Sequence, residues 1–431
     1  MTDSSSPDGN PKWPWRYVAH ATIEFRTPFA IRSGRGDVFS DSLFVVDANG
    51  LPAIPGSSIA GVLRHNAARF GFSPAEINDL FGQEIEKGQD IGNGARLTVS
   101  WACVHDRHDK PVEGLADPYG DQADDPVLEN ARQGVLRDHV RLGHRGSAEN
   151  RGKFEETLVA AGHRFTFELH LVGKAEDEAG WNRLLGLLSW RGLRLGGGSR
   201  RGFGAFTLIR LHQCGFDLAK KKDFGAYCDV GGFDLGGIKS SDQPTSDQPR
   251  VKSEPAGAVT IILKGFGPRE PWLFGGGVAE SGEDFAPVAE KRVTWRKDNR
   301  DGGLLGAVNA APVHMIPATG LKGSLSHRLA WHHNLLTARD RWRTAPPEES
   351  DPPPNDAKSA IEALFGRVKE SGTGVQGRIG RLVLDDLFLS EVLAATACGM
   401  SPRTASPVER AGAACSPKRC FGPARGRRAI A

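Results

Sequence analysis

The sequence predicts an α+β fold made of two tandem ferredoxin-like (RRM-like) domains, of which the second is incomplete. The main observation is a repeat: "IPGSSIAGVLRH" at residues 54–65 returns as "IPATGLKGSLSH" at residues 316–327. In both copies "LFG" follows, and then a glycine, a basic residue and a β-rich run that starts at Gly94 or at Gly380. Features that recur in one order indicate duplication of one domain type.

The order of predicted elements in the first copy supports this fold class. Apolar alternation predicts strands in "YVAHATIEFRTPFAI", "LFVVD", "ARLTVSWACV", "GVLRDHVRL" and "HRFTFELHLVG". A helix is expected to start at Ser57 or Ser58 as N-cap. Its apolar face is expected to consist of Ile59, Val62, Leu63, Ala67 and Phe70. A second helix over "EAGWNRLLGLLSWRG" leads into a glycine-arginine loop and a closing strand. Strand, helix, strands, helix, strand is the order of a ferredoxin-like unit.

Four segments divide the chain. We expect a complete domain at 15–215, a linker at 219–257, a partial second domain at 258–390 and an irregular tail at 391–431. The linker is rich in lysine and then in Ser, Asp, Gln and Pro. The second copy has no counterpart of the glycine-arginine loop after its "LFG". A truncated or frameshifted reading frame would produce the same incomplete second domain.

Composition sets limits on function. The net charge is +3 from 55 basic and 52 acidic residues, which gives no overall preference for nucleic acid. The sequence has no apolar run of about 20 residues and its polar start lacks a signal-peptide core, so we expect a cytoplasmic protein with no membrane contact. Six scattered cysteines argue against a disulfide framework, and Cys103, His105 and His108 favour an ordinary loop over a zinc site. The absence of a P-loop lysine motif and of a strand-linked GxGxxG turn argues against a nucleotide-binding enzyme.

The motifs together resemble the RAMP superfamily (repeat-associated mysterious proteins), specifically the backbone subunits of type III CRISPR effector complexes. The resemblance rests on "LPAIPGSSIAGVLRH", "LFG", "HVRLGHRGSAENRGKFEETLVAAGHRFTFEL" and "GGGSRRGFGAF". It implies a ribonucleoprotein subunit that binds guide RNA (crRNA), complementary target RNA and other effector subunits. It also implies a thumb-like hairpin within residues 135–165.

Several residues are predicted to contact RNA. A helix N-terminus at Ser57 and Ser58 offers backbone amides to a phosphate, although from the residues alone the two serines read as simple caps. The glycine-arginine loop offers cations and an aromatic ring, and a solvated hairpin is the alternative. Alternation places Arg137, His139 and Arg141 on one strand face, where charged residues could also merely protect an edge. The full set of predicted RNA contacts is Ser57, Ser58, Arg64, Arg137, Arg141, Arg145, Arg194, Arg200, Arg201, Phe203, Thr319 and Lys322.

Cleavage is expected from the resemblance, because cleaving members of the family need an aspartate in the loop before the "PGSS" motif. Asp41 stands there, Asp37 is a rival, and Asp284 is the nearest analogue in the second copy. Asp41 would bind a divalent metal, Mg²⁺ or Mn²⁺, with the RNA 2′-hydroxyl as nucleophile and no organic cofactor. From the residues alone, Asp37 and Asp41 read as turn formers in a glycine-rich loop. A non-catalytic scaffold is the alternative function. A guide-processing endoribonuclease is a weaker one, since His20 lies inside a predicted strand.

Overall fold

The computed structural model describes twelve stretches of the chain. They are residues 13–34, 43–83, 92–142, 148–233, 259, 273–277, 286–298, 302–337, 361–367, 377–389, 395–398 and 418–421.

One antiparallel sheet forms the centre of the first domain. Its strands are β1 (Trp15–Phe25), β2 (Leu97–Val99), β3 (Cys103–Val104), β6 (Arg164–Gly173) and β7 (Phe206–Asp217). The order is β2-β6-β1-β7, with β3 also paired to β6. Strand β1, the first in sequence, therefore lies between β6 and β7 in the sheet, as in a ferredoxin-like fold. The predicted α+β fold class is confirmed.

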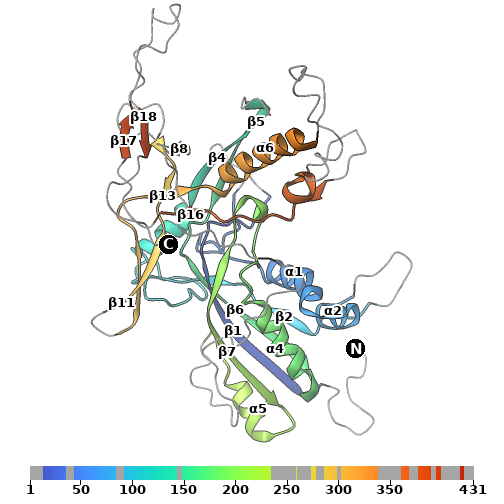
Figure 1. The fold of residues 1–431 in the computed structure, drawn as a ribbon. Coiled ribbons are helices and arrows are strands. Elements are labelled where there is room, and N and C mark those ends of the chain that lie inside the picture. Colours follow the sequence, from blue (N-terminus) through green and yellow to red (C-terminus); the bar gives the residue numbers. More distant parts are fainter. Residues whose placement is uncertain are drawn as a thin grey trace, which may run out of the picture.

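Helices cover one face of this sheet. They are α1 (Gly56–Ala67), which continues into a 3₁₀ turn η1 (Ala68–Phe70), α2 (Pro74–Phe81), and α4 (Glu178–Leu187) after the turn η2 (Ala175–Asp177). Figure 1 shows α1, α2 and α4 on the same side of the long strands. The predicted apolar face of α1 is confirmed, because Ile59, Leu63 and Ala67 are buried in the main core.

The core beneath these helices is aromatic at one end. The Phe25 and Phe29 rings stack with centroids 3.7 Å apart, and Phe165 meets both edge-on. Trp181 of α4 is fully buried and its Nε1 donates to Gln213 Oε1 at 2.9 Å. Such edge-to-face pairs favour one packing of the core over alternatives.

Two further helices lie apart from this layer. Helix α3 (Pro126–Gln133) is capped by Asp125, whose side chain accepts from the Val127 and Leu128 amides. Helix α5 (Lys221–Cys228) packs through Tyr227 against a small cluster around Phe216. The start of the predicted linker is therefore helical and joined to the first domain.

A long hairpin rises from the first domain between β3 and β6. Its strands are β4 (Val135–Leu142) and β5 (Ala148–Leu158), paired from Val135–Leu158 to Leu142–Ala148. Figure 1 shows this hairpin extending away from the sheet toward helix α6. The hairpin lies where the resemblance placed a thumb.

The second half of the chain is built from short strands and one long helix, α6 (Ala318–Thr337). A three-stranded sheet has the order β10-β13-β16, and the other strands form two-stranded ladders. The strands are β8 (Gly275–Gly277), β9 (Ala286–Pro287), β10 (Ala289–Glu290), β11 (Val293–Lys297), β12 (Leu304–Val308), β13 (Val313–Ile316), β14 (Gly366–Arg367), β15 (Arg378–Ile379), β16 (Leu387–Phe388), β17 (Ala395–Cys398) and β18 (Lys418–Phe421). Thus β17 and β18 form a ladder within the segment predicted to be an irregular tail.

The backbone around the two motif copies pairs in the same way. In the first domain Ile54 bridges Ala102, and in the second half Ile316 of the repeated motif pairs with Leu387. The β-rich runs that follow "LFG" therefore return to the same position beside each motif. This correspondence supports the predicted repeat for the second half, which we call the second unit.

Candidate nucleic-acid interface

The "PGSS" segment enters α1 without a side-chain cap. The N-cap residue is Pro55, and the Ser58 amide donates to the Pro55 carbonyl at 2.9 Å. The prediction that Ser57 or Ser58 caps the helix is wrong, and the Ser57 side chain is exposed instead. Gly56 is needed for packing, because a Cβ there would overlap the Val99 carbonyl oxygen. The first turn of α1 thus presents its amides with no side chain folded over them.

The glycine-arginine loop turns tightly between Arg194 and Ala205. Gly197 donates to Ala30 O at 2.9 Å and Gly204 donates to Pro28 O at 2.9 Å, which fixes both ends. Its 3₁₀ turn η3 (Ser199–Arg201) lies between Gly198 and Gly202, both at positive φ. Only glycine adopts that conformation at little cost. The loop is therefore ordered, in contrast to the alternative of a solvated hairpin.

Phe203 does not offer its ring to a base. Only 1 % of it is exposed, and it lies in the core beneath the guanidinium groups of Arg137 and Arg201, 5.2 and 5.7 Å from the ring centroid. The prediction that Phe203 stacks on RNA is wrong in this structure, because the aromatic ring closes the base of the loop.

Arg137 is also buried rather than presented on a free strand face. Its guanidinium binds Glu290, and its Nη1 donates to Asp386 Oδ2 at 2.6 Å. Burial lowers the pKa of Arg137, but the two carboxylates outweigh it and hold that pKa above the usual arginine value. The predicted RNA contact is corrected: Arg137 joins the first domain to the second unit. Arg141, further along β4, is exposed, and Arg145 lies outside the described residues.

Two arginines of the loop are neutralised as well. Arg194 binds Asp385 of the second unit, which also receives Arg26 at 3.2 Å. Arg201 binds Glu156 of β5 at 2.8 Å.

Glu156 also binds Arg32 and lies 3.3 Å from His139 Nε2. Burial raises the pKa of Glu156, yet its hydrogen bonds and the two arginines hold it below the usual value. A buried carboxylate between two cations fixes the loop against the base of the hairpin.

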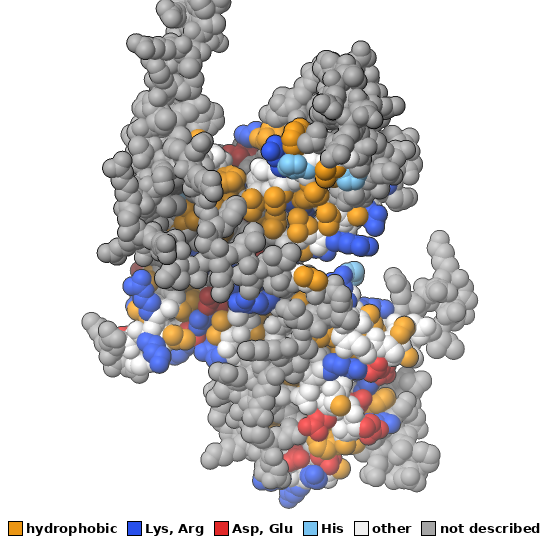
Figure 2. All heavy atoms as spheres, in the orientation of Figure 1, with side chains coloured by type: hydrophobic (Ala, Val, Ile, Leu, Met, Phe, Trp, Pro, Cys, Tyr) orange, Lys and Arg blue, Asp and Glu red, His pale blue; other side chains and the backbone are white. Residues whose placement is uncertain are grey.

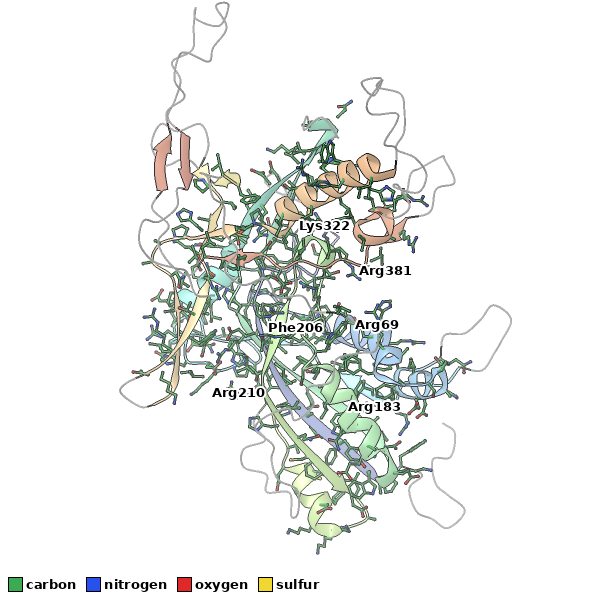
Figure 3. All side chains as sticks on the ribbon, in the orientation of Figure 1. Arg69, Arg183, Phe206, Arg210, Lys322 and Arg381 are labelled. Carbon is green, nitrogen blue, oxygen red and sulfur yellow. The ribbon has the colours of Figure 1, made fainter. Side chains whose placement is uncertain are left out.

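Beside this loop lie the further cations Arg69, Arg200 and Lys322, which we call the cationic strip. They come from η1, from the glycine-arginine loop and from α6, and Lys322 Nζ donates to the Arg200 carbonyl at 3.1 Å. Among the described residues none of the three has a carboxylate partner. Figure 3 shows Lys322 at the end of α6, with Arg69 below it and Arg381 beside them.

The electrostatics of the cationic strip favour an anion. Burial and then Arg69 and Arg194 lower the pKa of Arg200, while burial and then Arg200 lower the pKa of Lys322. Like charges held close together and partly desolvated repel one another until an anion is bound. Figure 2 shows basic side chains along the boundary between the part that carries α6 and the part that carries α1. An RNA backbone phosphate is an anion of the right kind.

The other predicted contacts are less central. Arg64 is partly exposed and donates weakly to Asn78 Oδ1 at 3.4 Å, and Thr319 is partly exposed in the first turn of α6. Sequence reasoning missed Arg69, Glu156, Glu290, Asp385 and Asp386. The adjacent acids in "LVLDDLFL" were the available signal, because they interrupt an apolar strand pattern.

The three candidate catalytic aspartates, Asp37, Asp41 and Asp284, lie outside the described residues. The residues that frame their loops are described. Val45 donates to Ile31 O and Val288 donates to Phe274 O, both at 2.8 Å.

The segment from Ile31 to Val45 is as long as the segment from Phe274 to Val288. Asp41 stands four residues before Val45, and Asp284 stands four residues before Val288. The greater distance from Asp284 to its motif arises afterwards, where the β11–β12 hairpin is inserted. Asp284 therefore corresponds to Asp41 in position.

The described residues offer little else for metal chemistry. They contain no group of three or more His, Cys, Asp or Glu side chains that could hold an ion. His105, considered for zinc, is fully buried between Asp109 Oδ1 at 2.9 Å and Thr166 Oγ1 at 2.7 Å. His20, considered for guide processing, is buried in β1 and contacts Glu168 at 3.0 Å.

Comparison with known proteins bears on the first domain. Residues 22–207 match the family model of the RAMP superfamily, so the predicted resemblance to that superfamily is confirmed over this part of the chain. No curated protein matches the chain. One similar solved chain comes from the "Type III-B Cmr-beta Cryo-EM structure of the Apo state"; it is 14 % identical, with a TM-score of 0.35, and the match covers 44 % of this chain and 96 % of that chain. None of the described helices combines the length and apolar character needed to cross a membrane.

Proposed function

We propose that this chain is a guide-RNA-binding backbone subunit of a type III-like CRISPR effector ribonucleoprotein. The observation that carries the proposal is the cationic strip, which lies between a RAMP domain and the second unit and has no carboxylate partner among the described residues. Arg200, Arg69 and Lys322 hold the guide backbone through its phosphates. The uncapped first turn of α1 offers a second phosphate position. Sequence is read by pairing between guide and target, as in other RNA-guided effectors.

Salt-dependent RNA binding tests this function. We expect Arg69→Gln, Arg200→Gln and Lys322→Gln each to weaken binding of a labelled guide RNA regardless of its sequence. Each lost phosphate contact should lower the slope of log affinity against log salt by about 1. Lys221→Gln and Lys222→Gln on α5 remove exposed cations far from the strip and serve as controls. Equal losses in both sets would reject the cationic strip as the RNA site.

We further propose that the complex cleaves target RNA at the loops that carry Asp41 and Asp284. The equal spacing of both aspartates from their framing valines supports two equivalent positions. One carboxylate is a small part of a divalent site, so RNA phosphate oxygens and water would provide the remaining ligands. The cation, Mg²⁺ or Mn²⁺, would stabilise charge at the scissile phosphate. Other effector subunits complete the particle.

The number of cuts distinguishes cleavage from scaffolding. The assembled complex, incubated with labelled complementary RNA and Mg²⁺ or Mn²⁺, should cut twice. Asp41→Ala should remove one cut and Asp284→Ala the other, with guide binding unchanged. Asp37→Ala tests the rival carboxylate of the same loop and should leave both cuts in place; loss of the first cut in that variant alone would move the role from Asp41 to Asp37. A complex that binds target RNA and cuts nowhere would make the chain a non-catalytic scaffold. The observation that favours a scaffold is that two arginines of the glycine-arginine loop, Arg194 and Arg201, are paired with carboxylates.

A further inference from the structure

Two further arginines lie next to the cationic strip and share one carboxylate. Arg26 directly follows β1, and Arg194 pairs with Ala205 at the base of the glycine-arginine loop. Arg26 Nη1 donates to Asp385 Oδ2 at 3.2 Å, and Arg194 Nη2 binds the other oxygen of the same carboxylate. We call Arg26 and Arg194 the arginine pair. An anion held between two guanidinium groups is an arrangement that also suits a phosphate.

The arginine pair has more donors than Asp385 satisfies. The Nε atoms of both arginines are buried and find no acceptor among the described residues. The Arg194 side chain is only 8 % exposed. The other contacts of the pair are long, because Arg26 Nη2 reaches the Arg191 carbonyl and Arg194 Nη1 the Phe203 carbonyl, each at 3.4 Å. Since buried donors normally have acceptors, the two Nε atoms indicate a site for an anion with more acceptor oxygens than Asp385 places there.

The charges around the arginine pair support the same interpretation. Burial is the main cause that lowers the pKa of Arg26, and the nearby Arg194 lowers it further against the opposing effect of Asp385. Burial, then Arg69 and then Arg194 lower the pKa of Arg200. The arginine pair and the cationic strip are therefore close enough to repel each other, and an anion that binds across both reduces this repulsion.

Asp385 differs from the adjacent Asp386 in its accessibility. The side chains of Asp385 and Arg26 are 35 % and 31 % exposed, whereas those of Asp386 and its partner Arg137 are 0 % and 6 % exposed. A partly exposed ion pair contributes little to stability, while separating the members of a buried cluster is costly. Asp386 therefore joins the two units permanently, and Asp385 can leave its two arginines at small cost.

We propose that Asp385 occupies a phosphate position of the guide RNA and that an RNA backbone phosphate displaces it from the arginine pair. This inference rests on the proposed function, because the arginine pair adjoins the cationic strip. Asp385 acts as an intramolecular competitor of the RNA. Without RNA, its carboxylate holds the segment before β16 on the glycine-arginine loop. With RNA this contact opens, while the buried cluster around Arg137 keeps the two units together.

Competition by Asp385 affects which phosphates bind. A free phosphate gains only the contacts of the arginine pair, and it must replace a carboxylate that is tethered in place at a high effective concentration. A longer RNA also gains the contacts of the cationic strip, so it displaces Asp385 more easily. The site therefore favours a continuous RNA backbone over small phosphates in the same solution.

Guide-RNA binding by the full-length chain tests this competition. Asp385→Asn keeps the shape of the side chain and removes its charge, so we expect the affinity for a labelled guide RNA to rise about three- to tenfold. Asp385→Glu keeps the charge and should bind like the wild type. Asp229→Asn, at the exposed end of α5, removes a negative charge far from the arginine pair and should leave the affinity unchanged. Adding Arg26→Gln to Asp385→Asn should abolish most of the gain.

Hydrogen exchange reports the displacement in the wild-type chain, so it decides the question even where a variant does not fold. The segment that carries Asp385 contains protected amides, such as that of Leu389, which donates to His314 O at 2.9 Å. Guide RNA should raise exchange in residues 382–389 of the wild type, and inorganic phosphate should not. In Asp385→Asn exchange in this segment should be high both with and without RNA.

The outcomes separate this inference from the proposed function. Tighter binding by Asp385→Asn together with RNA-dependent exchange in the wild type supports both. Three results would overturn the competition and leave guide binding intact: equal affinities of wild type and Asp385→Asn, an equal gain from Asp229→Asn, or exchange in 382–389 that does not rise when RNA binds. Failure of both the wild type and Asp385→Asn to bind guide RNA would reject the proposed function and this inference together.

Discussion

At the scale of single residues, glycines mark the places where separate backbone segments meet. Gly56, Gly162 and Gly202 each lack room for a Cβ, against Val99, Val293 and Ala318. Two of these three contacts join the first domain to the second unit. A motif glycine in this chain is thus a packing requirement as much as a turn residue.

Gly162→Ala tests this at the tighter interdomain contact. Gly162 has φ +92°, and its added Cβ would overlap the Val293 carbonyl, whose own amide donates to Ala161 O at 3.0 Å. Gly50→Ala is the matched control, because φ is +69° there and the space is open. We expect a loss of about 1–2 kcal/mol for the control from left-handed strain. The Gly162 variant should lose a further ~1–3 kcal/mol from overpacking, measured by urea unfolding. Equal losses would show that the second unit does not dock here.

His163 predicts a pH dependence of stability. It is fully buried, and burial lowers its pKa from 6.5 to about 3, so the folded chain holds it neutral with Nε2 donating to Asn130 Oδ1 at 3.0 Å. Between those two pH values the unfolded chain binds the extra proton and the folded chain does not. This contribution to stability is complete above pH 6.5 and is lost as the pH falls toward 3. His163→Gln should flatten the slope of unfolding free energy with pH in that window, and an unchanged slope would refute the assignment.

At the scale of elements, the sequence predicts what depends on local pattern. Apolar alternation located β1 and β6, the expected closing strand after the glycine-arginine loop is β7, and the apolar spacing located α1. The sequence does not predict which distant residues cover each face of a strand or helix. Arg137 and His139 do share one side of β4, but that side is buried because Glu290 and Asp386 arrive from far along the chain. Phe203 looked like a loop aromatic because its neighbours are glycine and arginine, and only the fold places it in the core.

The β11–β12 hairpin shows the same limit. Its sequence reads as a long loop before the second motif, yet it pairs from Val293–Val308 to Lys297–Leu304 and docks on the first domain. Gly306 donates to Arg107 O at 2.7 Å, and Trp295 Nε1 donates to Gly162 O at 2.8 Å. The hairpin is held by contacts with residues far away in sequence, and local propensity does not record those.

Trp295→Ala tests the docking of this hairpin. The substitution removes the Nε1 hydrogen bond and the contact with the Arg164 guanidinium, so we expect a loss of about 2–4 kcal/mol in unfolding free energy. Trp331→Ala on α6 is the control, since that ring is 40 % exposed and makes no interdomain hydrogen bond among the described residues. Hydrogen exchange should also rise in 293–308 for the Trp295 variant alone. Comparable effects from both tryptophans would argue against a docked hairpin.

At the scale of the whole molecule, near-neutral net charge conceals an ordered distribution of charge. The arginines Arg26, Arg137 and Arg194 of the first domain face Glu290, Asp385 and Asp386 of the second unit. Those pairs cancel in the total while the cationic strip beside them remains. Composition alone could not separate the two groups, because the pairing depends on the arrangement of the units.

The last prediction concerns the buried cluster of Arg137, Glu290 and Asp386. Arg137→Met leaves two buried carboxylates without their cation, which should cost about 3–5 kcal/mol and uncouple the second unit from the first domain. Burial already raises the pKa of Asp386 in spite of Arg137, so the variant should recover stability as the pH falls and the carboxylates protonate. Adding Glu290→Gln and Asp386→Asn removes both charges, and Asn keeps an oxygen for the Ala318 amide. The triple variant should regain most of the loss in urea unfolding at neutral pH. If it stays as unstable as Arg137→Met, the cluster acts through packing of the arginine stem rather than through charge, and the two units are joined mainly by the β11–β12 hairpin.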